Sequence, residues 1–134
     1  MNIALIDTDI LSYFLNGDQY VLNNIQEYLT YHNTLSFSEI SYFEILAGLS
    51  YKKASAKIKQ FDLFSSKCDI LKLSNSSIRK SATIYGELRR KGITIGSLDL
   101  LIAGIAIDNN MVLITNNTKH YSVITGLRIS NWKI

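Results

Sequence analysis

Short apolar runs alternate along this 134-residue chain with longer stretches in which apolar residues recur every three or four positions. The short runs are rich in β-branched residues and predict strands over 2–6, 34–38, 69–73, 111–115 and 126–130. The longer stretches predict helices over 9–16, 19–33, 39–50, 52–67, 74–91 and 98–110. Strands that alternate with helices are typical of a mainly parallel sheet with helices on both faces.

The sequence therefore predicts an α/β fold, with a single domain over residues 1–134 built as three layers around a central sheet of about five short strands. The chain contains no proline and only seven glycines, which is unfavourable for linkers or disordered tails. The helix predicted over 98–110 is apolar on nearly every side, so we expect it near the centre of the fold.

Composition and charge narrow the class of protein. The single cysteine, Cys68, can form no internal disulfide and lies in no metal-ligand spacing, which favours a reducing cytoplasm. No apolar run approaches the roughly 20 residues of a membrane span, and we expect neither membrane insertion nor a signal peptide. A formal charge of +3 is compatible with a nucleic acid partner but does not require one.

Acidic residues stand where a parallel sheet usually binds its ligands, beyond the carboxyl ends of the strands. Asp7 ends the first predicted strand. Asp9 is better explained as a helix cap, because an acid at a helix N-terminus accepts hydrogen bonds from free N–H groups. Glu44 shares a helical face with the apolar residues Ile40 and Ala47, so it either reaches to the rim of the core or serves a functional site.

Asp99 opens the most apolar helix, where Ser97 is available as the cap. Asp7, Glu44 and Asp99 would then meet at one edge of the sheet, where repulsion should raise the pKa of one of them. A divalent cation, Mg²⁺ or Mn²⁺, relieves that repulsion and suits a site made of oxygen ligands. Because such a metal activates water and stabilises charge on a phosphate, the cluster predicts hydrolysis of phosphodiester bonds.

Four segments resemble the PIN-domain ribonucleases and, within them, the VapC toxins of bacterial toxin-antitoxin pairs. In chain order they are "LIDTDILSYFL", "SEISYFEILAGL", "IGSLDLLIAGIAI" and "LITNNTKHYSVITGLRISNW", which together span essentially the whole chain. The resemblance implies that Asp7, Glu44 and Asp99 bind the catalytic metal, that the substrate is RNA and that a VapB-like antitoxin blocks the site. Together with the aliphatic content of the helices, it also predicts a homodimer.

Two positions depart from the family pattern. Asp9 stands where the family often has asparagine, and the place of a fourth acid is taken by Asn116 or Asn117, of which Asn117 is the better match. An amide oxygen can ligate Mg²⁺ but adds no charge, so we expect Asn117 in the catalytic set and one tightly held metal. The candidates for RNA contact are Thr8, Thr115, Asn116, Arg89, Arg90 and Lys119. Cations at the C-terminal end of a helix also interact favourably with the helix dipole, which is an alternative explanation for the arginines.

Two other functions fit parts of the sequence. The "DTD" after an apolar strand is similar to the start of haloacid-dehalogenase-like phosphatases, with Asp7 as nucleophile. Against this, Leu11 replaces the expected Thr or Val, and no strand-end lysine followed by a double acid is present. The second alternative is a catalytically weakened PIN-like domain that acts by binding RNA or protein, suggested by the missing fourth carboxylate.

Overall fold

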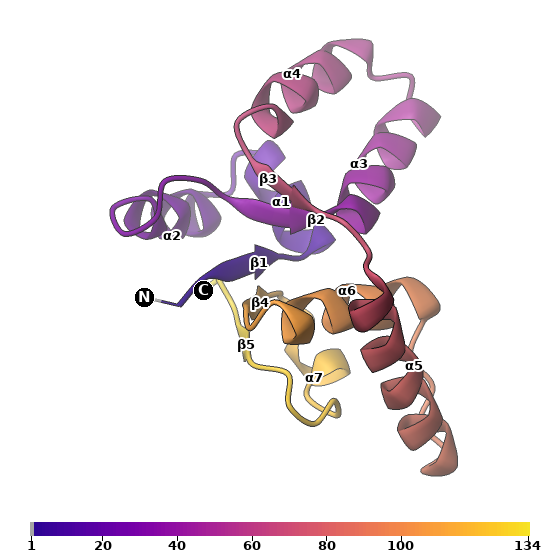
Figure 1. Cartoon of the computed structure of the whole chain (residues 1–134). Coiled ribbons are helices and arrows are strands. Elements are labelled where there is room, and N and C mark those ends of the chain that lie inside the picture. The colour runs from indigo at the N-terminus through magenta and orange to yellow at the C-terminus, as the bar shows by residue number, and fades with distance from the viewer. Residues whose placement is uncertain (1) are drawn as a thin grey trace.

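The computed structural model describes residues 2–134, which form five strands and seven helices (Figure 1). The strands are β1 (Ala4–Ile6), β2 (Ser36–Ser38), β3 (Asp69–Leu71), β4 (Val112–Ile114) and β5 (Ile129–Ser130). The helices are α1 (Thr8–Leu15), α2 (Gln19–Tyr28), α3 (Glu39–Tyr51), α4 (Ser55–Ser65), α5 (Asn75–Arg90), α6 (Ser97–Asp108) and α7 (Thr118–Tyr121). Among these helices, none combines the length and the apolar character needed to cross a membrane.

All strand pairs are parallel, but their hydrogen bonds form two sheets instead of one. The larger sheet has the order β1-β4-β5, and the smaller one pairs β2 with β3. Strand β1 lies next to β2, so the smaller sheet lies beside the β1 edge of the larger sheet (Figure 1). In the β1–β4 ladder Ile6 stands opposite Ile114, which places the next residues, Asp7 and Thr115, side by side at the carboxyl edge. The prediction of an α/β fold with about five parallel strands is confirmed.

Strand β1 separates two hydrophobic clusters, because successive side chains of a strand point to opposite faces. Leu5 packs with residues of α5 and α6, whereas Ala4 and Ile6 pack with residues of α1, α2 and α4. The two clusters account for the expected three layers. As its apolar sequence indicates, α6 is central, with Ile102, Ala103, Ile105 and Ala106 each at 0 % exposure.

Helices α5 and α6 approach each other closely at Gly104. A Cβ atom at this position would lie 2.0 Å from Ser81 Oγ and 2.6 Å from the carbonyl oxygen of Ser77. The Ser81 hydroxyl donates across the same contact to the carbonyl oxygen of Leu100, at 2.8 Å. The absence of a side chain at Gly104 therefore lets α5 lie directly against α6, the helix that carries Asp99 (Figure 1).

Several local predictions were inaccurate; the helix predicted over 19–33 ends at Tyr28, and the N-cap of α6 is Gly96 instead of Ser97. The short helix α7 lies in a stretch with no predicted element, since a single turn produces no helical periodicity. Residue Lys53 has a left-handed backbone (φ +54°), so the helix predicted over 52–67 begins only at Ser55. The N-cap of α1 is Asp7 and not Asp9, because the helix begins one residue earlier than predicted.

Candidate active site at the carboxyl edge of the sheet

Asp7 lies at the end of β1 with its side chain almost completely buried, at 6 % exposure. Its Oδ1 accepts from the Thr8 amide at 2.9 Å, and its Oδ2 accepts from the Thr115 hydroxyl at 2.9 Å. Burial, followed by the charges of Asp9 and, more weakly, Asp99, raises the pKa of Asp7 to about 7. The expected raised pKa is therefore present on Asp7, although burial contributes more to it than repulsion does.

Asp9 joins the two loops at this edge. Its Oδ1 accepts from the Ile10 amide at 2.7 Å, and its Oδ2 accepts from the backbone amide of Asn116 at 3.0 Å. Burial raises the pKa of Asp9, while the hydrogen bond from Asn116 opposes the shift. Asp9 thus ties the start of α1 to the segment after β4, a role that requires an oxygen acceptor.

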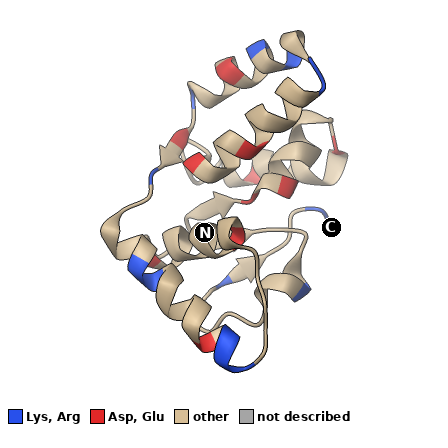
Figure 2. Cartoon of the chain, turned by 90° about the vertical axis from the view of Figure 1, so that its right-hand side faces the viewer, with Lys and Arg blue, Asp and Glu red and all other residues tan. Residues whose placement is uncertain are grey.

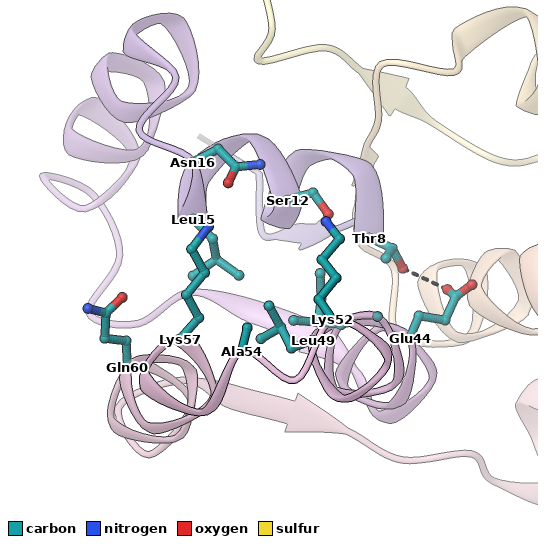
Figure 3. Close-up of a pocket in the computed structure, with 12 residues that line it drawn as sticks. Thr8, Ser12, Leu15, Asn16, Glu44, Leu49, Lys52, Ala54, Lys57 and Gln60 are labelled. Carbon is teal, nitrogen blue, oxygen red and sulfur yellow. Dashed lines mark hydrogen bonds between the residues drawn. The ribbon is translucent and has the colours of Figure 1, made fainter.

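Glu44 is held against the start of α1 by Thr8. The Thr8 hydroxyl lies 2.7 Å from Glu44 Oε1 (Figure 3). It also lies 2.8 Å from Ser41 Oγ, which in turn lies 3.4 Å from Ser38 Oγ. A carboxylate only accepts, so the single Thr8 proton points to Glu44 and Ser41 donates to Thr8. These hydroxyls therefore form a directed chain that ends on Glu44, which makes Thr8 a neighbour of the acids as well as a candidate for RNA contact.

Asp99 lies in the first turn of α6 and faces His120 of α7. The His120 Nε2 and Asp99 Oδ2 atoms are 2.9 Å apart. Asp99 also acts electrostatically on Asp7, which places two of the three predicted metal ligands near one another. The sequence suggests His120 only as a candidate phosphate contact or proton donor near this edge, because a histidine in a segment without predicted structure carries no signal of its partner.

Tyr121 is a second residue near this edge whose surroundings the sequence did not predict. It is 1 % exposed, and its hydroxyl is buried near Asp99 without a well-formed hydrogen bond. Burial, then the charges of Asp7 and Asp99, raises the pKa of this hydroxyl far above its ordinary range, so it stays protonated. The available signal was weak, since only the apolar pair Tyr121 and Ile124 indicates that this segment packs inward.

Thr115, Asn116 and Asn117 line the segment between β4 and α7. Thr115 is fully buried, donates to Asp7 and accepts from the Asn117 amide at 3.0 Å. The Asn116 side chain interacts with Asn131 at 3.0 Å and with Tyr13 at 3.4 Å. Asn117 is exposed and is the N-cap residue of α7, so its amide side chain stays available at the rim of the site.

The cations predicted to contact RNA lie apart from the acids. Arg89 and Arg90 occupy the last turn of α5, whose end projects from the molecule (Figures 1 and 2). The guanidinium of Arg89 lies over the ring of Tyr85, 5.5 Å from its centroid. Lys119 is exposed on α7, beside His120. Of these cations, only Lys119 is next in sequence to a residue that contacts a predicted metal ligand.

The three predicted ligands do not form a complete metal-binding group in their present rotamers. Within residues 2–134, no set of three His, Cys, Asp or Glu side chains is gathered closely enough to hold an ion. Asp7 and Asp99 are neighbours, but Glu44 is turned to Thr8 and Asp99 to His120. The chemistry of the donors nevertheless fits a hard cation, since the raised pKa of Asp7 marks a buried carboxyl group whose ionised form a nearby positive charge would stabilise.

A groove opens beside Glu44, between α1, α3 and α4 (Figure 3). Its volume is about 220 Å³, and Thr8 and Glu44 line its end nearest the acids. Leu15, Ile45 and Leu49 supply apolar surface, and the remaining lining residues include Ser12, Asn16, Lys52, Lys57 and Gln60. The groove therefore begins at the edge of the sheet where the carboxylates Asp7, Glu44 and Asp99 lie, which we call the carboxylate edge.

Residues 4–124 match the family model described as "PIN domain". The chain therefore belongs to this family. It is 37% identical over 135 residues to the Ribonuclease VapC2 of Rickettsia felis, covering 97% of this chain and 98% of that protein. The predicted resemblance is thereby confirmed.

Solved structures give the same result. The crystal structure of VapBC2 from Rickettsia felis, bound to a DNA fragment from its promoter, matches with a TM-score of 0.87 and 34% identity over 96% of this chain and 98% of that one. The DNA-bound VapBC structure from Salmonella typhimurium matches with a TM-score of 0.86 and 26% identity over 98% and 99%. Both neighbours are toxin-antitoxin complexes.

Proposed function

We propose that this chain is a metal-dependent endoribonuclease, the toxin of a VapBC-type toxin-antitoxin pair that acts in the cytoplasm. The observation that carries the proposal is the buried Asp7, whose pKa is raised to about 7 by burial and by the charges of Asp9 and Asp99. A bound cation would stabilise the ionised form of this carboxyl group. The similarity to a VapC ribonuclease over nearly the full length supports the substrate class.

Asp7, Glu44 and Asp99 are the residues that would hold Mg²⁺ or Mn²⁺, with Asn117 at the rim. When bound, the ion supplies a polarised water as nucleophile and stabilises the charge that develops on the phosphate. Thr8 holds Glu44 in its orientation by donating to its Oε1. Thr115 holds Asp7 in place, and Asp9 keeps the two loops at a fixed separation. Because Glu44 and Asp99 have other partners now, they must change partners to bind the ion together.

A VapB-like antitoxin is the expected protein partner, as in the VapBC complexes that this chain resembles. An antitoxin that covers the carboxylate edge would exclude the substrate, and a cation inserted among the carboxylates would replace the metal electrostatically. We also expect a homodimer. Exposed apolar side chains on the outer face of α5, Ile78 and Tyr85, offer surface for such an interface.

The test is cleavage of a labelled single-stranded RNA by the purified chain in Mg²⁺, in Mn²⁺ and in chelator. We expect internal cleavage only with metal, and a loss of at least about a hundredfold in Asp7→Asn. Asp62→Asn is the matched control, because it removes one exposed carboxylate far from the site. Metal-independent cleavage, or equal activity of Asp7→Asn, would refute the proposal. Release of phosphate from a monoester would support the phosphatase alternative, and RNA binding without cleavage the weakened domain.

A further inference from the structure

The groove beside Glu44 is built on one face of α3. Glu44, Gly48 and Lys52 follow one another at intervals of four residues and all line it. At about 1.5 Å per residue, this face leads roughly 12 Å away from the acids. A Cβ atom at Gly48 would meet nothing within 4 Å, so the missing side chain leaves the middle of the groove open.

Two lysines in this groove have no compensating charge. Lys52, at the end of α3, and Lys57, on α4, are exposed and form no hydrogen bond or ion pair with the residues that the structure describes. Their side chains extend across the groove towards α1 (Figure 3). Since Glu44 at the far end is the only acid in the lining, the part of the groove beyond Gly48 is electropositive and complements an anion.

We propose that this groove binds the single-stranded RNA segment next to the scissile phosphate, with Lys52 and Lys57 contacting backbone phosphates and the apolar floor facing the bases. The proposal rests on the proposed function and extends it to the path of the substrate. The amide side chains of Asn16 and Gln60 lie where base edges can form hydrogen bonds with them.

The test is binding of a fluorescein-labelled single-stranded RNA of mixed sequence in chelator, over a series of NaCl concentrations. The double variant Lys52→Glu/Lys57→Glu should bind at least about tenfold more weakly, and its salt slope should fall by about 1.4, or 0.7 per phosphate contact. The matched control is Lys59→Glu/Lys67→Glu, which makes the same charge change on exposed lysines outside the groove. We expect the control to keep the wild-type salt slope.

A second variant fills the groove without changing the charge. Gly48→Met should weaken RNA binding while leaving the melting temperature unchanged or higher, because Gly48 is helical, exposed and free of contacts. Equal loss of affinity in the groove and control double variants would overturn the proposal. So would normal RNA binding in the groove variants with loss of antitoxin binding, which would assign the groove to a protein. Wild-type protein that binds no RNA would refute the proposed function itself.

The hydroxyl of Tyr121 is buried near Asp99 without a well-formed hydrogen bond. Such a buried polar group is unfavourable and rare, so its persistence calls for an explanation. The neighbouring residue His120 already contacts Asp99, and the charges of Asp7 and Asp99 act on the hydroxyl. We infer that Tyr121 is a positioning residue, whose hydroxyl donates to the metal-bound carboxylates or to the water that they orient.

This inference predicts opposite effects on stability and metal binding. In chelator, Tyr121→Phe should melt at the wild-type temperature or above, because no well-formed hydrogen bond is lost. Its affinity for Mn²⁺, measured by calorimetric titration, should fall about three- to tenfold. Tyr28→Phe is the matched control, since Tyr28 is equally buried but accepts from the Ala4 amide at 3.0 Å. It should lower the melting temperature and leave Mn²⁺ binding unchanged.

The measurements distinguish failure of the positioning role of Tyr121 from failure of the metal-dependent function. Unchanged Mn²⁺ affinity in Tyr121→Phe, or a lower melting temperature in chelator, would overturn the positioning role. Wild-type protein without measurable Mn²⁺ binding would instead refute the metal-dependent function on which the role rests.

Discussion

Replacing Asp7 by asparagine should stabilise the metal-free protein at neutral pH and above. The substitution preserves shape and hydrogen bonds: the asparagine oxygen can accept from Thr8, and its amide can donate to Thr115, which has a free lone pair. What is removed is a carboxyl group whose ionisation is opposed by burial. The structure therefore assigns Asp7 a destabilising effect in the absence of a cation.

The magnitude follows from the pKa of Asp7, which is about 7 in the folded protein against 3.8 for an unperturbed aspartate side chain. Between these values the native state binds more protons than the unfolded chain, so stability falls as the pH rises from about 4 through 7. A shift of roughly three pKa units corresponds to on the order of 4 kcal/mol by pH 8. At about 4 °C per kcal/mol, this is a difference in melting temperature of up to about 16 °C.

The assay is thermal unfolding of wild type and Asp7→Asn in chelator at pH 5, 6, 7 and 8. The stability advantage of the variant should grow with pH and level off above about pH 7. Saturating Mg²⁺ or Mn²⁺ should reverse the order, because ligand at about 100 times its dissociation constant adds about 2.7 kcal/mol to the wild type and much less to the variant. A variant that is less stable than the wild type in chelator, by the same amount at every pH, would refute the reasoning.

Expression of the chain without an antitoxin should arrest growth, and Asp7→Asn should relieve the arrest; an arrest that persists in the variant would exclude catalysis as its cause. Gly104→Ala should destabilise the fold by about 2 kcal/mol or more, because the added methyl group collides with Ser81, and urea unfolding measures this loss. Thr8→Val should lower the cleavage rate about tenfold with a smaller change in melting temperature, since it releases Glu44. Light scattering should give the mass of two chains; one chain at all concentrations would exclude the homodimer.

The sequence predicted most of the architecture because period and length distinguish its strands from its helices. Asp7 was recognised from its position at a strand end, a rule that holds for any parallel sheet. The split of the sheet between β1 and β2 could not be predicted, since it depends on hydrogen bonds between segments about 30 residues apart. The cap of α1 was assigned to the wrong aspartate because Asp7 and Asp9 are equally suited to that role.

The partners of the site residues were the least predictable part. Thr8 and Glu44 are 36 residues apart, and Asp99 and His120 are 21 apart, so no local pattern records that they meet. The positioning role of Tyr121 became apparent only from its buried hydroxyl, which lies near Asp99 without a well-formed hydrogen bond. Sequence periodicity reports which face of an element is buried, but not which polar atom on that face lacks a hydrogen bond.

The contact between Asp7 and Thr115 also determines when, during synthesis of the chain, the site can first form. Its two halves are separated by 108 residues, and β4 must pair with β1 before Thr115 can hold Asp7. At a translation rate of about 5 to 20 residues per second, the ribosome needs about 5 to 22 seconds to add the intervening chain. During this interval the nascent polypeptide carries the first aspartate without the partner that positions it. The activity of the site is thereby withheld until the β4 segment has been synthesised.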